Sequence, residues 1–197
     1  DTRLNKTKKK MKQLLYFLIA IVLVSCSKKD ETISADSIYN VESKWEKQDG
    51  SKISLVDFKG KVMVTAMIFT SCKTACPRLT AEMRNISKKV GKVNPDEIQY
   101  VLISIDPETD TPEVMTAYLK NNQFDEKEWT FIRSSEEDTR ELANVMAIKY
   151  KEISPVEFSH SNIISVYAKD GTLAFQKEGL DENSEITANE IKKQLKL

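Results

Sequence analysis

At the centre of this sequence stands Phe69-Thr70-Ser71-Cys72-Lys73-Thr74-Ala75-Cys76-Pro77, which carries two of its three cysteines. The apolar run of residues 62–69 predicts a buried strand, and the amphipathic pattern of residues 78–90 predicts a helix. Unpaired backbone N–H groups and the helix dipole at such a junction favour thiolate over thiol. The stretch therefore indicates either a redox dithiol or half of a soft-metal site.

The composition argues against a nucleic-acid partner. The 197 residues include 30 basic and 30 acidic side chains, so the formal net charge is zero. A nucleic-acid surface would need a basic excess on one face of the protein. The hydrophobic content of 40% is ordinary for a globular domain, and the chain has only one histidine to weigh beside its cysteines.

The amino-terminal segment predicts an export signal. Residues 1–13 are rich in lysine, and the apolar run of residues 14–24 is shorter than the roughly 20 residues that a membrane-spanning helix needs. A basic stretch followed by a short apolar core is typical of a secretory signal. The segment ends in Leu23-Val24-Ser25-Cys26, which resembles the lipobox of bacterial lipoproteins. This resemblance implies cleavage before Cys26 and a lipid on its sulfur, and the alternative is a short membrane anchor with an incidental cysteine.

We therefore expect three parts in the chain. Residues 1–25 would be a signal peptide with an upstream extension, residues 26–37 a lipidated tether, and residues 38–197 the folded domain. The predicted location is the cell envelope, on the periplasmic side, with the protein anchored to a membrane by its lipid. Disulfides can persist there, and a lipid on Cys26 would leave the other two cysteines to pair with each other or with a different group.

Strands alternate with helices through the folded part. Residues 38–47 and 52–56 predict an amino-terminal hairpin around the turn Asp49-Gly50. The other expected strands are 62–69, 98–105, 129–132, 162–167 and 172–175, and the expected helices are 78–90, 112–121, 185–195 and one that ends at 147, with Thr111 capping the second and Ser134 or Ser135 the last. This order predicts an α/β, thioredoxin-like fold: a mixed central sheet flanked by helices, with an extra amino-terminal β-hairpin.

The predicted topology brings separated side chains to one edge of the sheet. Sites in open α/β sheets form beyond the carboxyl ends of the parallel strands. Cys72 and Cys76 follow one such strand, and Asp106 follows the next. His160 precedes a strand that we expect to run antiparallel, so it would lie at the same edge.

The Cys-x-x-x-Cys spacing favours a metal over a disulfide without excluding oxidation. Residues i and i+4 of a helix have Cβ atoms about 5–6 Å apart, whereas a disulfide needs about 3.5–4.5 Å. Two thiolates and an imidazole suit Cu(I), and with an added ligand could hold Cu(II) or Zn(II). A structural disulfide, a surface histidine and ordinary turn chemistry in residues 106–112 stay open as alternatives. Met63 and Met67 alternate along a buried strand and are expected in the core.

Three sequence motifs follow one another along residues 40–195, and each occurs once. They are Thr70-Ser71-Cys72-Lys73-Thr74-Ala75-Cys76-Pro77, Ser104-Ile105-Asp106-Pro107-Glu108-Thr109-Asp110-Thr111-Pro112 and Ser159-His160-Ser161. Together they resemble the Sco/SenC family of copper-binding, thioredoxin-like proteins that act in cytochrome c oxidase assembly.

The resemblance implies which residues form the site. Copper would be bound by Cys72, Cys76 and His160, and Asp106 would influence the ion from outside its ligand set. Lys73 departs from the proline that is common after the first cysteine of the family. Its ammonium would lower the pKa of Cys72 and slightly disfavour a second positive charge nearby, which leaves copper binding and thiol exchange both open.

The function implied by the resemblance is that of a metallochaperone. It would deliver copper to the dinuclear copper centre of cytochrome c oxidase, and its partner would be the copper-bearing subunit of that enzyme or another copper or thiol partner protein. The alternative is a membrane-anchored thiol–disulfide oxidoreductase in which Cys72 attacks a partner's cysteines and Cys76 resolves the mixed disulfide. A copper- or redox-responsive signalling role is a third hypothesis, so whether the protein is an enzyme is open at this point.

Overall fold

The computed structural model describes residues 33–154, 157–180 and 184–197. The predicted export signal and Cys26 lie outside these residues. Within them, no helix has the length and apolar character needed to cross a membrane.

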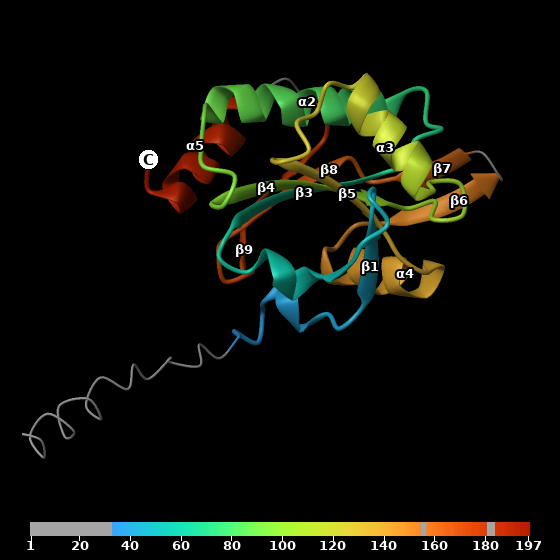
Figure 1. The fold of residues 1–197 in the computed structure, drawn as a ribbon, viewed down its shortest axis with the longest axis horizontal. Coiled ribbons are helices and arrows are strands. Elements are labelled where there is room, and N and C mark those ends of the chain that lie inside the picture. The colour runs from blue at the N-terminus through green and yellow to red at the C-terminus, as the bar shows by residue number, and fades with distance from the viewer. Residues whose placement is uncertain (1–32, 155–156, 181–183) are drawn as a thin grey trace, which may run out of the picture. The chain divides into compact units, whose positions relative to one another are not determined.

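A mixed sheet of seven strands forms the centre of the domain, in the order β2-β1-β5-β4-β3-β8-β9 (Figure 1). The strands are β1 (Lys44–Lys47), β2 (Lys52–Ser54), β3 (Val62–Ile68), β4 (Ile98–Ser104), β5 (Trp129–Arg133), β8 (Ile163–Tyr167) and β9 (Leu173–Glu178). As predicted, β3, β4 and β5 are parallel, and β8 runs antiparallel to β3 and pairs with β9 in a late hairpin. Every residue of β3 and β4 is buried, which explains why their sequences are mostly apolar.

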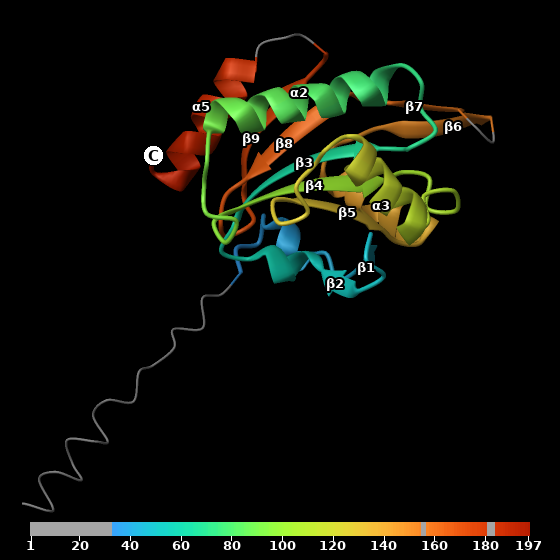
Figure 2. The ribbon, with the colours of Figure 1, turned by 45° about the horizontal axis from the view of Figure 1, so that its top comes forward.

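Helices cover both faces of this sheet (Figures 1 and 2). One face carries α2 (Ala75–Val90), α3 (Pro112–Asn121) and α5 (Ser184–Leu195), and the other carries α4 (Glu136–Val145). The reason is the right-handed crossover: β3, β4 and β5 follow one another in one direction, and the connection back to β8 runs in the opposite direction. Thr111 caps α3 as predicted, and of the two candidate serines Ser135 caps α4.

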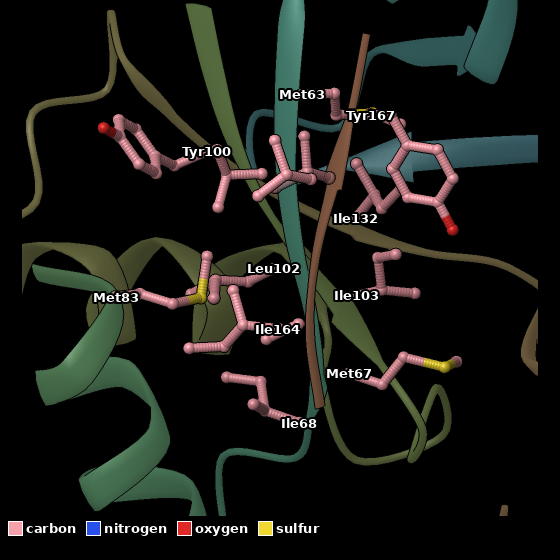
Figure 3. Packing of buried hydrophobic residues seen from close by; sticks show 14 of the residues in the cluster. Met63, Met67, Ile68, Met83, Tyr100, Leu102, Ile103, Ile132, Ile164 and Tyr167 are labelled. Carbon is pink, nitrogen blue, oxygen red and sulfur yellow. The ribbon is translucent and has the colours of Figure 1, made fainter. Parts of the chain in front are cut away.

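The core lies on both sides of the central strands. Figure 3 shows Met83 of α2 facing the side of the sheet on which Leu102 and Ile164 lie, while Met67 and Ile132 lie on the opposite side. The two methionines predicted in the core, Met63 and Met67, are each 1% exposed. Their burial confirms the prediction that they are packing residues.

The amino-terminal hairpin is shorter than predicted. Residues Ile38–Asn40 form a 3-10 helix, η1, because the Ser37 side chain accepts the backbone N–H of Tyr39. Residues Leu55–Phe58 form a second one, η2, which begins at a capping box between Ser54 and Asp57. On both sides of the hairpin, local side-chain hydrogen bonds therefore stabilise a 3-10 helix where the sequence pattern predicts a strand.

A second sheet was not predicted. It consists of β6 (Tyr150–Ser154) and β7 (Glu157–His160), which pair antiparallel at one side of the domain (Figure 2). Three consecutive residues of β6, 151–153, are exposed, so the alternation of apolar and polar residues that marks a half-buried strand is missing. His160 is thus the last residue of a strand, rather than part of a loop before β8.

Candidate metal and dithiol site

Cys72 and Cys76 lie at the amino terminus of α2, where the sequence pattern predicted them. Both are free thiols. The helix begins at Ala75, so Cys76 is in its first turn while Cys72 precedes it. The two residues therefore do not occupy successive turns of one helix, as the spacing argument assumed. Instead, the backbone N–H of Cys76 points to the sulfur of Cys72, with 3.4 Å between the two atoms.

His160 reaches this dithiol from β7, 84 residues further along the chain. Its Nε2 lies 3.4 Å from the sulfur of Cys76. Its Nδ1 lies 3.1 Å from the carbonyl oxygen of Ser161, so we assign the ring proton to Nδ1, because a carbonyl can only accept. The lone pair of Nε2 then points to Cys76, which is the orientation that a metal-ligating histidine requires.

Two aromatic rings fix the position of this histidine. Phe69, the residue after β3, packs edge-on against the imidazole of His160 with 6.0 Å between ring centroids. Phe158 of β7 packs against Phe69 at 5.1 Å. This cluster was not predicted, because Phe158 belongs to the hairpin that the sequence pattern does not reveal.

The pKa values of the two thiols are shifted in opposite directions. Burial acts to raise the pKa of Cys72, but the backbone N–H groups of Cys76, Thr74 and Ala75 hydrogen-bond its sulfur, and together they bring the pKa below the ordinary value of a cysteine. Cys76 is 1% exposed, and burial raises its pKa far above the ordinary value. The half-buried Cys72 is therefore the thiol that ionises first.

The imidazole is neutral at physiological pH. Burial lowers the pKa of His160, and the hydrogen bond with the Ser161 carbonyl opposes this shift only in part. A neutral imidazole has a lone pair for a soft cation or for the proton of the Cys76 thiol.

Asp106 follows β4 at the expected edge of the sheet. It is buried, and its Oδ1 accepts the backbone N–H of Thr109 at 3.4 Å. Its Oδ2 is buried without a hydrogen-bond partner among the described residues. The predicted influence of Asp106 on the site stays a prediction.

Asp110 is a residue of the site that was not among the predicted ones. Its carboxylate accepts hydrogen bonds from Thr70, just before Cys72, and from Ser104 at the end of β4. Its negative charge contributes to the raised pKa of Cys76. The available signal was its place in the same loop as Asp106, beyond the carboxyl end of a parallel strand.

Two contacts connect the three predicted ligands, and Cys76 takes part in both. Cys72 contacts Cys76, and Cys76 contacts His160. Among residues 33–154, 157–180 and 184–197, no three His, Cys, Asp or Glu side chains are already arranged as a metal-binding group. The arrangement brings Cys76 to both of the other residues, and a metal bound by all three would require Cys72 and His160 to close around it.

Comparisons with known proteins agree with this architecture. Residues 36–196 match the model of the SCO1/SenC family. The SCO1 protein homolog of Bacillus subtilis is 29% identical over 177 residues, which is 88% of this chain and 90% of the relative.

Solved structures share the fold. A SCO1/SenC family lipoprotein from Bacillus anthracis has a TM-score of 0.70 at 25% identity and covers 77% of this chain and 92% of its own. BsSco, described as having a disulfide switch and as a member of the Sco family of cytochrome c oxidase assembly proteins, has a TM-score of 0.69 at 26% identity, covering 80% and 94%. Copper-bound ScoI of Bradyrhizobium japonicum, at 22% identity, shows the shared fold with a TM-score of 0.66 and coverage of 77% and 96%. The predicted thioredoxin-like fold is thereby confirmed, and this chain belongs to the SCO1/SenC family.

Proposed function

We propose that this protein binds one copper ion through Cys72, Cys76 and His160 and delivers it to the dinuclear copper centre of cytochrome c oxidase. The observation that carries the proposal is the 3.4 Å contact between the Cys76 sulfur and His160 Nε2, across 84 residues of sequence. Two sulfurs and a neutral imidazole nitrogen are soft ligands that suit Cu(I). The copper-bound ScoI structure and the assembly role stated for BsSco support the same cargo and recipient.

Copper is the cargo here, so the site has to bind it and release it. The half-exposed Cys72 is the ligand that a partner's thiolate can reach first, while the buried Cys76 and the packed ring of His160 retain the ion until exchange is complete. Ligand exchange between thiolate-rich sites accounts for delivery without turnover of a small substrate.

A Cu(I) titration of the reduced protein against a chromophoric chelator tests the binding step. We expect one ion per chain, and we expect His160→Ala to weaken the affinity at least about tenfold. Met67→Leu is the matched control, because it removes a soft sulfur from the core without touching the site. Unchanged affinity and spectra in His160→Ala would remove His160 from the site. Copper transfer to the isolated copper-bearing subunit, followed by the absorption of its dinuclear centre, tests delivery.

A second candidate function is thiol–disulfide exchange on a partner protein. It is favoured by the asymmetry of the dithiol: Cys72 is partly exposed with a lowered pKa, and Cys76 is buried with a raised pKa. This is the pattern of an attacking and a resolving thiol. Cys76→Ser should then trap a mixed disulfide through Cys72, and the absence of any trapped partner together with loss of function in His160→Ala cells would count against exchange.

The envelope location belongs to the same proposal. The likeness to the Bacillus anthracis lipoprotein supports a lipid on Cys26, which would confine copper delivery to a membrane surface. Metabolic labelling with a fatty acid, compared between the full chain and Cys26→Ser, measures this. Equal labelling of the two proteins would contradict it.

A further inference from the structure

A cavity of about 410 Å³ lies between the loop after β4, the amino-terminal turn of α4 and the β6–β7 hairpin. Pockets that bind ligands have volumes in this range. One lining residue is Phe158, whose ring packs against Phe69 at 5.1 Å, and Phe69 in turn packs against the imidazole of His160 at 6.0 Å. The same ring therefore belongs to the cavity and to the aromatic cluster that positions His160, so the cavity is a neighbour of the dithiol site.

The wall of this cavity is acidic. Its carboxylates are those of Asp106, Glu108, Glu136 and Glu152, and Arg140 is the single basic side chain among the described residues that line it. Arg140 forms an ion pair with Glu136 at 2.7 Å, so these two charges compensate each other. The other three carboxylates have no ion-pair partner in the part of the chain that the structure describes. Their uncompensated charge favours a cation in the cavity.

Two buried polar atoms of the wall also lack hydrogen-bond partners. Asp106 is only 7% exposed, and while its Oδ1 accepts the Thr109 N–H, its Oδ2 has no partner among the described residues. The hydroxyl of Tyr150, on β6, is likewise buried without a partner there. A buried polar group without a partner costs free energy, which a donor entering from the cavity would recover. Because a carboxylate only accepts hydrogen bonds, the missing partner of Asp106 is a donor.

The acidic side chains of the wall do not suit a bare metal ion. Within residues 33–154, 157–180 and 184–197, no three His, Cys, Asp or Glu side chains are arranged as a metal-binding group. A guanidinium, in contrast, carries five N–H donors in a fork and can serve acceptors that lie apart. The wall also includes Pro107 and Phe158, whose apolar surface suits the methylene stem of a long basic side chain.

We propose that this cavity binds an arginine side chain of the protein that meets the dithiol. The guanidinium would donate to the carboxylate of Asp106 and to the hydroxyl oxygen of Tyr150, and the stem would pack against Phe158. The identity of the partner rests on the proposed function, since both copper delivery and thiol exchange bring a protein to Cys72. The affinity of the cavity for a guanidinium does not depend on either function.

The probe for this inference is the peptide acetyl-Gly-Arg-Gly-amide, titrated into the reduced, isotope-labelled full chain and followed by the backbone amide shifts in NMR spectra. We expect saturable shifts at residues 106–109, 134–136 and 150–152, with a dissociation constant in the millimolar range. The same peptide with citrulline keeps the shape without the charge and should bind at least about tenfold more weakly. Methylguanidinium lacks two methylene groups of the stem and should also bind about tenfold more weakly than the arginine peptide.

Two variants test the two acceptors. Asp106→Asn keeps an oxygen for the Thr109 N–H but replaces the other acceptor with an NH2 donor, so the affinity for the arginine peptide should fall at least about tenfold. Tyr150→Phe keeps the ring and removes the hydroxyl, and should weaken binding about threefold. The matched control is Asp96→Asn, which removes an exposed carboxylate before β4, at the other end of that strand from Asp106, and should bind like the wild type.

The outcomes separate this inference from the proposed function. Equal affinity for the arginine and citrulline peptides, shifts that map outside the cavity, or unchanged affinity in both Asp106→Asn and Tyr150→Phe overturns it even if the wild type binds copper. Equal affinity for methylguanidinium and the arginine peptide overturns the assignment to a protein side chain. A wild type that binds the arginine peptide as expected but binds no copper overturns the copper function and supports the role of the cavity.

Discussion

Replacing Gly171 with alanine tests how the amino-terminal segment packs on the turn between β8 and β9. Gly171 has a φ of +84°, and a Cβ there would meet the Ser37 hydroxyl and two ring carbons of Tyr39, the latter at 2.5 and 2.7 Å. The segment cannot simply move aside. The Ile38 backbone N–H donates to the Gly171 carbonyl at 2.9 Å, and the Ser37 hydroxyl donates to the Asp170 carbonyl at 2.7 Å.

Two costs add in this variant. A left-handed backbone costs an alanine about 1–2 kcal/mol, and forcing a methyl into a packed contact costs about 1–3 kcal/mol. The free energy of unfolding should therefore fall by about 2–5 kcal/mol. For a domain of this size each kcal/mol lowers the melting temperature by about 2–4 °C, so we expect a decrease of about 4–20 °C.

Urea and thermal unfolding followed by circular dichroism measure this difference. The matched control is Gly179→Ala, because Gly179 has a φ of +99° but, apart from its chain neighbours, no described residue has an atom within 4 Å of the place that its Cβ would take. The free energy of unfolding of Gly179→Ala should fall only by the backbone cost, about 1–2 kcal/mol. If the two variants are equally stable, the steric contact with Ser37 and Tyr39 contributes nothing, and the packing of η1 on this turn is not what the geometry implies.

Three other substitutions test the interior and one helix terminus by the same unfolding measurements. Lys177→Met leaves the carboxylate of Glu82, 8% exposed, without its ion-pair partner and should cost about 3–5 kcal/mol, and adding Glu82→Gln should recover part of the loss. Phe131→Ala removes a fully buried ring from β5 and should cost about 3–5 kcal/mol, so a loss below about 1 kcal/mol would contradict its place in the core. Ser135→Ala removes the side chain that accepts the Asp138 N–H at 3.1 Å and should cost about 1 kcal/mol, with Ser135→Asp restoring the cap.

The two middle strands of the sheet, β3 and β4, could be predicted because they are buried on both faces. Val62–Ile68 and Ile98–Ser104 consist mostly of apolar residues, and the cap residues Thr111 and Ser135 mark where α3 and α4 begin. These signals are local, so a single sequence contains them. The direction of β8 also places His160 at the same edge of the sheet as Cys76, so their neighbourhood was predictable, although the strand β7 that carries His160 was not.

The missed features depend on contacts between distant segments. The β6–β7 hairpin, at one side of the domain in Figure 2, has exposed residues on β6 and buries only part of Phe158, whose partner Phe69 lies far away in the sequence. Asp110 is an ordinary loop acid in the sequence, and its hydrogen bonds with Thr70 and Ser104 join it to segments that lie 40 and six residues away. The hydrophobic periodicity of a single sequence contains no information on such contacts between distant residues.

Burial raises the pKa of Cys76 because a buried thiolate lacks water around its charge. A bound cation would compensate that charge, so the same burial favours a thiolate that is bound to a cation. A thiol with a raised pKa keeps its proton at neutral pH, so it takes no part in exchange until something removes that proton or replaces it. On the proposed function a bound Cu(I) would supply the positive charge in place of the proton, and binding would release protons. Affinity should then fall as the pH is lowered, first because Cys72 is protonated and then because His160 loses its lone pair to a proton. A metal affinity independent of pH between 5 and 8 would show that the thiols are not the ligands, whatever the fold.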